Sequence, residues 1–213
     1  MTTESLIERL AAQLRPTPRR AVARRLAGLA GAGVIVSVVL VGLTLGFRPD
    51  LPSALGTPMF WTKLAYTLAL GGISIWALER LSRPATPARE RMLWLLAPVG
   101  VVLALCTGQL AGAPGGDRMP LVMGDTAAVC PWRILTFSAP PFLALVWAVR
   151  GLAPTSPRVT GAVLGVCAGG LGAAAYALAC TESAAPFLAT WYNLAIVGVA
   201  LIGYLAAPWA LRW

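Results

Sequence analysis

Long apolar stretches without charged residues dominate the chain. Six stretches of at least 15 residues contain no Asp, Glu, Lys or Arg, and each is bounded by charged residues. A helix needs about 20 mainly apolar residues to cross the hydrocarbon core of a bilayer. The pattern therefore predicts six transmembrane helices, which lie at about 26–47, 62–80, 92–112, 133–150, 159–180 and 188–211.

The second and fourth of these spans have the weakest pattern. The stretch between Lys63 and Glu79 is short, so it spans a bilayer only if the side chains at its ends reach out to the interface. The fourth span contains Pro140 and Pro141. Proline removes a backbone donor and clashes with the preceding turn, so we expect these residues to kink or break the helix.

A short amphipathic pattern precedes the first span. Residues 3–14 read TESLIERLAAQL, in which Ser5 and Glu8 fit a capping box, and Pro16 and Pro18 end the helix. The apolar residues that recur on one face at helical spacing are Leu6, Ile7, Leu10, Ala11 and Leu14. Two interpretations stay open. The helix lies on the bilayer surface, or its apolar face docks in a groove of a cytoplasmic partner.

Composition supports an integral membrane protein and disfavours most catalytic chemistry. Of 213 residues, 58% are hydrophobic and 12% are charged, which is about half the charged share of a soluble domain. The chain has no histidine, and histidine is the commonest general base and metal ligand. No catalytic motif appears and no ionisable residue lies near the centre of a span. We therefore expect no enzyme activity and no cofactor, and an ion-coupled transporter is disfavoured.

The basic residues predict the orientation. With six spans, 13 of the 17 Lys and Arg residues fall on the side that holds both termini. By the positive-inside rule this side is cytoplasmic. The net charge of +9 therefore reflects topology and does not indicate direct nucleic-acid binding. We divide the chain into a cytoplasmic partner-binding segment, residues 1–25, and a six-span transmembrane domain, residues 26–213.

Glycine pairs at GxxxG spacing recur on several spans. This spacing puts both glycines on one helix face and lets two helix backbones approach closely. Packing within one bundle is the favoured interpretation, and a homo-oligomer is the alternative. The pairs are Gly42/Gly46, Gly108/Gly112, Gly161/Gly165 and Gly165/Gly169.

Two of the four cysteines are candidate functional residues. Cys106 and Cys167 lie within spans, where cysteine usually acts as a small apolar residue. Cys130 and Cys180 fall on the outer, oxidising side at similar depth, where a disulfide can persist. A structural disulfide, two unpaired thiols, a soft-metal site and an oxidant sensor all remain open. Glu182 follows Cys180 closely and is a candidate auxiliary group.

Several motifs, in this order and spacing, carry a family resemblance. They are ESLIERLAAQL at residues 4–14, GFRPDL at 46–51, TPMFWTKLAY at 57–66, GDTAAVCPW around Cys130, ALACTE around Cys180, FLATWYNLAI and a terminal LRW. Over residues 4–213 the chain resembles the NrsF family of six-span bacterial inner-membrane anti-sigma factors. The resemblance implies an all-α membrane bundle whose N-terminus holds an extracytoplasmic-function sigma factor in the cytoplasm.

The resemblance also implies roles for the candidate residues. An outer signal, in some members a heavy metal or oxidative stress, releases the sigma factor through the two outer cysteines. Cys130 and Cys180 would be the sensor pair, and the partner contacts would be Leu6, Ile7, Leu10 and Leu14. In related sequences the second cysteine often follows a histidine. Here Ala179 stands in that place, which weakens a metal site and leaves redox chemistry standing. The alternatives are a small-molecule or metal transporter and a membrane scaffold protein.

Overall fold

The structure, a computed structural model, describes residues 3–13, 20–83, 88–152, 154 and 156–211. The described residues contain helices and no strand, which confirms the all-α class. In chain order the elements are α1 (Thr3–Gln13), α2 (Ala21–Thr44), α3 (Leu51–Ala54), α4 (Pro58–Leu81), α5 (Arg89–Leu93), α6 (Leu96–Gly112), η1 (Gly115–Asp117), α7 (Arg118–Met123), α8 (Cys130–Val149), α9 (Pro157–Ala177), α10 (Ala185–Phe187), η2 (Leu188–Tyr192) and α11 (Asn193–Ala210).

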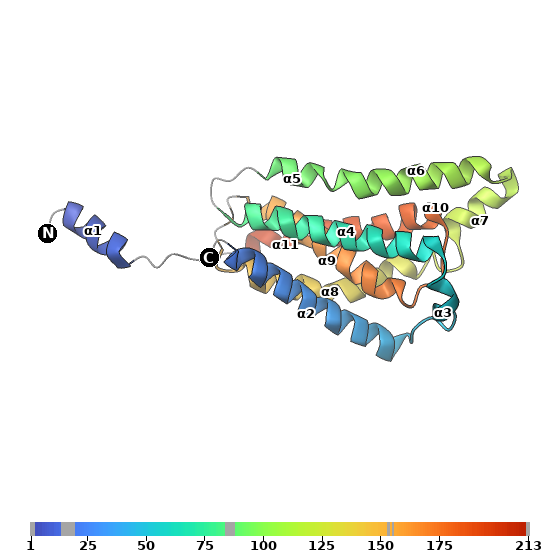
Figure 1. Cartoon of the computed structure of the whole chain (residues 1–213), viewed down its shortest axis with the longest axis horizontal. Helices are drawn as coiled ribbons and strands as arrows, with labels where there is room; N and C mark the ends of the chain where they lie inside the picture. The colour runs from blue at the N-terminus through green and yellow to red at the C-terminus, as the bar shows by residue number, and fades with distance from the viewer. Residues whose placement is uncertain (1–2, 14–19, 84–87, 153, 155, 212–213) are drawn as a thin grey trace.

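The long helices run back and forth along one axis and form a bundle (Figure 1). Helix α9 lies at its centre and packs against α2, α4, α8 and α11. Helix α6 lies at the edge of the bundle, and Val102 is the one residue of this helix that is buried. Helix α1 stands apart from the bundle, beyond the end where α2 begins.

Glycines on α9 allow this central packing. A Cβ atom on Gly161 would lie 2.2 Å from the carbonyl oxygen of Gly203 on α11, and one on Gly165 would lie 2.4 Å from that of Val199. Both distances are far below van der Waals contact, so only glycine fits. Internal packing is therefore confirmed for the α9 pairs. Gly108 and Gly112 on α6 differ, because a Cβ atom on either would meet nothing within 4 Å.

The fourth long helix does not break at Pro140 and Pro141, so the break that the sequence allowed does not occur, and a kink stays a prediction. Helix α8 continues through both residues from Cys130 to Val149. In a membrane bundle, neighbouring helices can satisfy the backbone groups that proline leaves without a partner. Here the hydroxyl of Ser37 on α2 donates to the carbonyl oxygen of Phe137.

Five helical segments of the described chain are long and apolar enough to cross a membrane. Helix α4 is as long as the longest single helix among them, but it contains Lys63, Glu79 and Arg80 and is not one of the five. The five are 21–44, 89–112, 130–149, 157–177 and 185–210. The composition of these segments is consistent with a multi-pass membrane protein.

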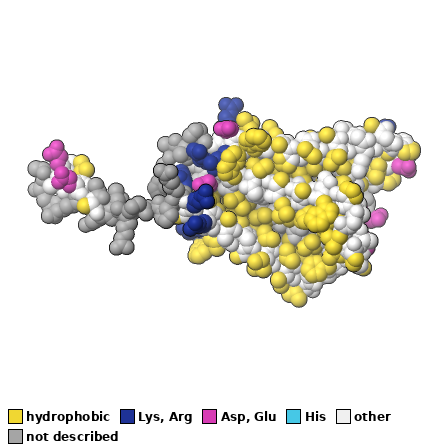
Figure 2. All heavy atoms as spheres, in the orientation of Figure 1, with side chains coloured by type: hydrophobic (Ala, Val, Ile, Leu, Met, Phe, Trp, Pro, Cys, Tyr) yellow, Lys and Arg dark blue, Asp and Glu magenta, His cyan; other side chains and the backbone are white. Residues whose placement is uncertain are grey.

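The bundle has two chemically different ends. At one end α2 begins and α11 ends, and arginine side chains gather there (Figure 2). We call it the arginine end; its described basic residues are Arg20, Arg24, Arg25, Arg80, Arg83, Arg89, Arg91, Arg150 and Arg158. At the other end α8 begins and α9 ends. We call it the cysteine end, because it holds Cys130 and Cys180. The flank between the two ends is largely apolar.

Candidate functional site

The chain turns at the cysteine end bring Cys130 and Cys180 into one buried cluster. Cys130 is the first residue of α8, and its N–H donates to the carbonyl oxygen of Thr126 at 2.8 Å. Cys180 follows the end of α9, and its N–H donates to the carbonyl oxygen of Tyr176 at 3.0 Å. Both cysteines are buried in the same apolar core. The structure thus brings together two residues that lie 50 positions apart in the sequence.

Neither thiol is in a disulfide. All four cysteines are free, so a Cys130–Cys180 disulfide, one of the alternatives that the sequence left open, is not supported. Sequence topology placed both cysteines at similar depth, but pairing also requires the two Cβ atoms to approach at a specific geometry. Cys167 behaves as an ordinary core residue, and its thiol donates to the carbonyl oxygen of Gly71 at 3.4 Å.

Arg48 holds the segment around Cys180. Its backbone N–H donates to the carbonyl oxygen of Leu178 at 3.1 Å, and its guanidinium donates to that of Cys180 at 3.2 Å. The same guanidinium binds both carboxylate oxygens of Asp50, at 2.8 and 2.6 Å. This hydrogen-bonded pairing raises the pKa of Arg48 and lowers the pKa of Asp50. The loop between α2 and α3 is therefore fastened to the end of α9.

Lys63 reaches the same segment from α4. Its ammonium donates to the carbonyl oxygen of Cys180 at 3.3 Å and to that of Glu182. It also lies 5.6 Å from the centre of the Tyr192 ring, within range of a cation–π contact. The side chain is only 2% exposed. Two cations from different elements thus converge on the backbone of Cys180.

Glu182 joins the two cysteine-bearing loops. One oxygen of its carboxylate accepts hydrogen bonds from the N–H of Asp125 at 2.9 Å, and from the N–H and hydroxyl of Thr126 at 3.0 Å each. Gly124 has a positive φ of 52°, and a Cβ atom on it would lie 2.5 Å from the other carboxylate oxygen. Glu182 is therefore a structural link between the loop before Cys130 and the loop after Cys180.

Aromatic rings belong to the same buried cluster as Cys130 and Cys180. Tyr176 stacks on Phe137, with ring centres 6.3 Å apart, and also lies 6.3 Å from Tyr192. Tyr192 closes the short π-helical turn η2, and Phe187 packs against the edge of its ring. The hydroxyls of Tyr176 and Tyr192 are buried without a conventional hydrogen-bond partner among the described residues. The two cysteines and these rings therefore share one buried apolar core.

The described part of the chain holds no group of three or more His, Cys, Asp or Glu side chains that could bind a metal ion. The carboxylate of Glu182, the nearest candidate for a third ligand in the sequence, is directed at Asp125 and Thr126.

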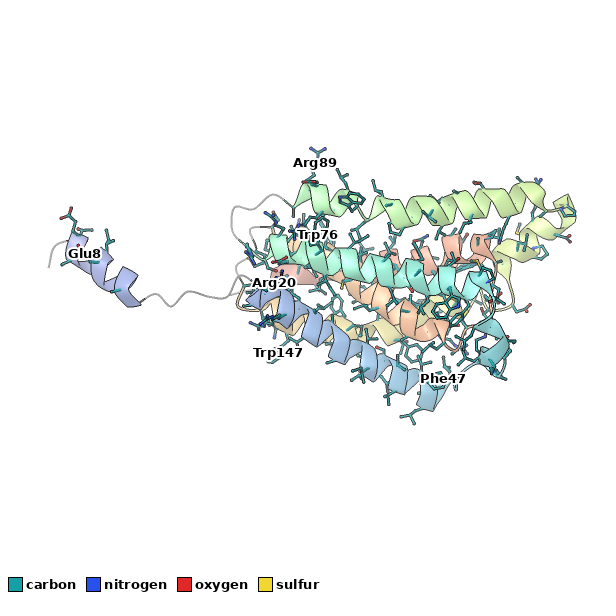
Figure 3. The ribbon with its side chains drawn as sticks, viewed as in Figure 1. Glu8, Arg20, Phe47, Trp76, Arg89 and Trp147 are labelled. Carbon is teal, nitrogen blue, oxygen red and sulfur yellow. The ribbon has the colours of Figure 1, made fainter. Side chains whose placement is uncertain are left out.

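At the arginine end, guanidinium groups connect helix ends to one another. Arg25 on α2 donates to the carbonyl oxygens of Trp147 at 3.1 Å and Arg150 at 3.3 Å, at the end of α8. The guanidinium of Arg150 in turn donates to the carbonyl oxygen of Ala210, the last residue of α11, at 2.8 Å. Figure 3 shows Trp147 and Arg20 at this end, with Phe47 toward the opposite end of α2. These arginines therefore hold the ends of α2, α8 and α11 together.

The N-terminal segment contains the predicted partner-binding residues. Residues 3–13 form α1, and Ile7 is exposed, with 59% of its surface accessible. Glu8 projects from the same helix (Figure 3). Leu14 and the side chains of Leu6 and Leu10 lie outside the described residues. The position of α1 apart from the bundle leaves Ile7 without a packing partner there.

Sequence reasoning missed two residues of this site, Arg48 and Lys63. It counted both as outer-side charges and gave them no further role. One signal was available, because Lys63 is the single lysine in a chain with 16 arginines. A lysine at one position, where every other basic residue is arginine, indicates a need for a compact ammonium.

Comparisons with known proteins show the family of the chain. A family described as "NrsF: Negative regulator of sigma F" matches residues 10–213. The chain is 38% identical to the anti-sigma-F factor NrsF of Caulobacter vibrioides, and 37% identical to a probable anti-sigma-F factor NrsF of Azospira oryzae. Both alignments cover the whole of each chain. No solved structure matches. The chain therefore belongs to the NrsF family of negative regulators of sigma F.

Proposed function

We propose that this chain is a membrane-bound anti-sigma factor that sequesters an extracytoplasmic-function sigma factor and releases it in response to a periplasmic signal. The observation that carries the proposal is the full-length match to the NrsF family, whose members here are named for regulating sigma F. The role is regulatory and needs no catalytic group.

The chain crosses the inner membrane six times, with α4 as the remaining span. The length of α4 supports this, because its 24 residues extend about 36 Å at 1.5 Å per residue. Its charged residues lie near its two ends, where Lys63 and Glu79 are bound by protein groups. The arginine end faces the cytoplasm under the positive-inside rule, and the cysteine end faces the periplasm.

The cytoplasmic segment 1–25 is the sigma-binding element. It ends on Arg25, which is bound to the end of α8, and it begins with α1, which stands clear of the bundle. A short amphipathic helix binds a partner by placing apolar residues into a groove. We assign that role to Leu6, Ile7, Leu10 and Leu14.

The signal acts on the thiols of Cys130 and Cys180, by oxidation or by another thiol-directed reagent. Helix α8 offers a direct route across the membrane. It begins at Cys130 and ends at the carbonyl groups that Arg25 binds. A shift of α8 would thus reach the root of the N-terminal segment. A two-state bundle, biased by the chemical state of the thiols, accounts for release.

Partner capture tests the anti-sigma function. The protein, tagged at its C-terminus and extracted in mild detergent, should retain a sigma factor that a variant lacking residues 2–18 does not. Leu10→Asp should abolish retention while membrane insertion stays intact. Glu4→Gln, on the polar face of α1, is the matched control and should retain the partner. If Leu10→Asp still retains the sigma factor, the docking face is wrong. If the wild type retains none, the anti-sigma function is wrong.

A separate experiment tests the sensor. Replacing both Cys130 and Cys180 by Ser should leave the sigma factor held and abolish its release by the inducing signal. The matched control replaces Cys106 and Cys167, the two cysteines away from the cysteine end, and should respond normally. Unaltered induction in the Cys130/Cys180 variant would refute the sensor and leave the anti-sigma function standing.

A further inference from the structure

At the arginine end, guanidinium groups lie over aromatic rings. Arg25 lies 5.9 Å from the centre of the Trp147 ring, and Arg91 lies 4.3 Å from the centre of the Trp76 ring. In both pairs the guanidinium also donates a hydrogen bond to the backbone carbonyl oxygen of the same tryptophan. Each of these rings therefore holds an arginine that has an acceptor within the protein.

Arg158 forms a third pair of this kind, but without the acceptor. Its guanidinium lies 5.7 Å from the centre of the Tyr204 ring, within range of a cation–π contact. Among the described residues, this guanidinium has no hydrogen-bond acceptor and no ion-pair partner. A guanidinium carries five N–H donors. Arg158 is therefore positioned by a ring, while its donors stay available to an acceptor from outside the chain.

A groove of about 580 Å³ opens beside this guanidinium, between the start of α9 and the last turns of α11. Val159 and Tyr204 are both exposed, so the groove is open at the surface of the bundle. Both helices contribute to its walls. The described residues that line it are Ser156, Pro157, Arg158, Val159, Tyr204 and Pro208.

The groove lies where the membrane-spanning bundle meets its arginine end. Farther along α9, the backbones of Gly161 and Gly203 are in direct contact, and a Cβ atom on either glycine would clash. Arg158 precedes this contact, at the second position of α9. Arginine and tyrosine suit the membrane interface, because each combines an apolar body with a polar tip. The groove is therefore at the depth of lipid headgroups.

The chemistry of the walls selects the occupant. No carboxylate is among the described residues that line the groove, so the positive charge of Arg158 has no counter-charge there. Val159 and Pro208 add apolar surface to the same groove. The occupant must therefore combine a negative charge with an apolar body. A phospholipid has both, and its phosphate can accept paired hydrogen bonds from a guanidinium.

We propose that this groove binds one anionic phospholipid of the cytoplasmic leaflet. Arg158 binds the phosphate, and the apolar part of the lipid lies against Val159 and Pro208. Tyr204 is a positioning residue, because its ring holds the guanidinium in place. An anionic headgroup is favoured over phosphatidylcholine, because the arginine end repels the additional cation of that headgroup. The choice of leaflet rests on the proposed orientation of the bundle, whereas the binding itself does not.

Lipid titration of the purified full-length protein measures this site directly. The protein in mild detergent is titrated with phosphatidylglycerol, and native mass spectrometry counts the lipids that stay bound. Arg158→Gln should raise the half-saturating lipid concentration at least about tenfold, because hydrogen bonds to a charged group are lost. Phosphatidylcholine should bind the wild type more weakly than phosphatidylglycerol. An unchanged titration of the Arg158 variant would overturn the proposal, as would equal binding of the two lipids.

Two matched controls separate the groove from the general charge of this end. Arg89→Gln removes an arginine that projects away from the bundle (Figure 3), and it should leave the titration unchanged. Val159→Trp fills the groove without removing a charge, and it should weaken binding. Val197→Trp, at another exposed position on α11, should bind normally. If Arg89→Gln weakens binding as much as Arg158→Gln does, charge alone attracts the lipid and the proposal is wrong.

Variants of Tyr204 test its positioning role. Tyr204→Phe keeps the ring and should bind phosphatidylglycerol as the wild type does, whereas Tyr204→Ala should bind it more weakly. Equal binding by these two variants would show that the ring does not position Arg158.

A soluble headgroup distinguishes a lipid site from a phosphate site. Glycerol 3-phosphate should not bind at the concentration at which phosphatidylglycerol saturates the protein. Saturation by both compounds at the same concentration would identify a site for free phosphate compounds and refute the lipid assignment. Because these titrations include no sigma factor and no thiol reagent, their failure is distinct from failure of the proposed function.

Discussion

The hydroxyl of Ser37 on α2 donates a 2.7 Å hydrogen bond to the carbonyl oxygen of Phe137 on α8. In an uninterrupted helix this carbonyl would accept the N–H of the residue four positions later. That residue is Pro141, which has no N–H. Ser37 therefore supplies, from a neighbouring helix, the donor that proline removes, and α8 continues as one helix from the cysteine end to the arginine end.

We expect Ser37→Ala to destabilise the bundle by about 1 kcal/mol, because the Phe137 carbonyl would then lie buried without a donor. Thr44→Ala is the matched control. Its hydroxyl is on the same helix, but it is exposed and bonds to its own helix at Leu40. Denaturant unfolding in detergent, followed by circular dichroism, measures both. Equal stability of the two variants would contradict the role given to Ser37.

Gly33 on α2 packs against Pro141 on α8, so a larger side chain at this position tests the close approach of the two helices. A Cβ atom there would lie 2.5 Å from the Cα atom of Pro141, and backbone cannot move aside as a flexible side chain can. Gly33→Ala should cost about 1–3 kcal/mol through overpacking. Gly31→Ala, two residues earlier, meets nothing within 4 Å and should be neutral or slightly stabilising. The thermal unfolding midpoints of the two variants measure this difference. If Gly33→Ala is as stable as Gly31→Ala, α2 and α8 can separate at little cost and the prediction is wrong.

The apolar pattern predicts much of this fold, for a physical reason. In a bilayer every backbone group must be satisfied within the protein, so long apolar stretches can only form helices. The pattern is less informative where protein contacts replace lipid or water. It predicts a second span that begins only near Lys63, at about residue 62, because the charge-free stretch between Lys63 and Glu79 is short. In the structure α4 begins at Pro58, and protein carbonyl groups bind the ammonium.

The candidate site was predictable only in part. Topology predicts that Cys130 and Cys180 lie on one side, and the structure brings them into one cluster. The partners of Cys180 could not be predicted, because Arg48 lies 132 residues before it and Lys63 lies 117 residues before it. Such contacts depend on how α4 and α9 pack, which no local pattern encodes. The role of Glu182 as a link between loops depends on the same packing.

The Arg48–Asp50 pair predicts a dependence of stability on pH. Hydrogen bonding to Arg48 lowers the pKa of Asp50 in the folded protein. A group with a lowered folded pKa stabilises the fold above its unfolded pKa, which is about 4 for Asp, and loses this effect as the pH falls through the folded value. Asp50→Asn should therefore be less stable than the wild type at neutral pH, and the difference should disappear in acid. Thermal midpoints from pH 7 downward measure it, and a difference that persists unchanged in acid would rule the pair out.

Glu182 holds the loop before Cys130 to the loop after Cys180. Glu182→Ala removes an acceptor of three hydrogen bonds from Asp125 and Thr126. Hydrogen bonds to a charged group contribute more than neutral ones, so local opening of this end should become easier by at least about 1.4 kcal/mol, a factor of ten. In a protein that keeps only Cys130, alkylation at a fixed pH should accelerate by about that factor.

The control for this prediction is Asp117→Ala, because Asp117 is an exposed carboxylate on η1 at the same end of the bundle. It should leave the alkylation rate of Cys130 unchanged. Glu182→Gln keeps one oxygen acceptor without the charge and should give an intermediate rate. Circular dichroism confirms that each variant is folded before the rates are compared. If folded Glu182→Ala protein reacts no faster than the control, the two loops are held together by packing of Phe187 and Tyr192, and Glu182 contributes little to closing the thiol pocket.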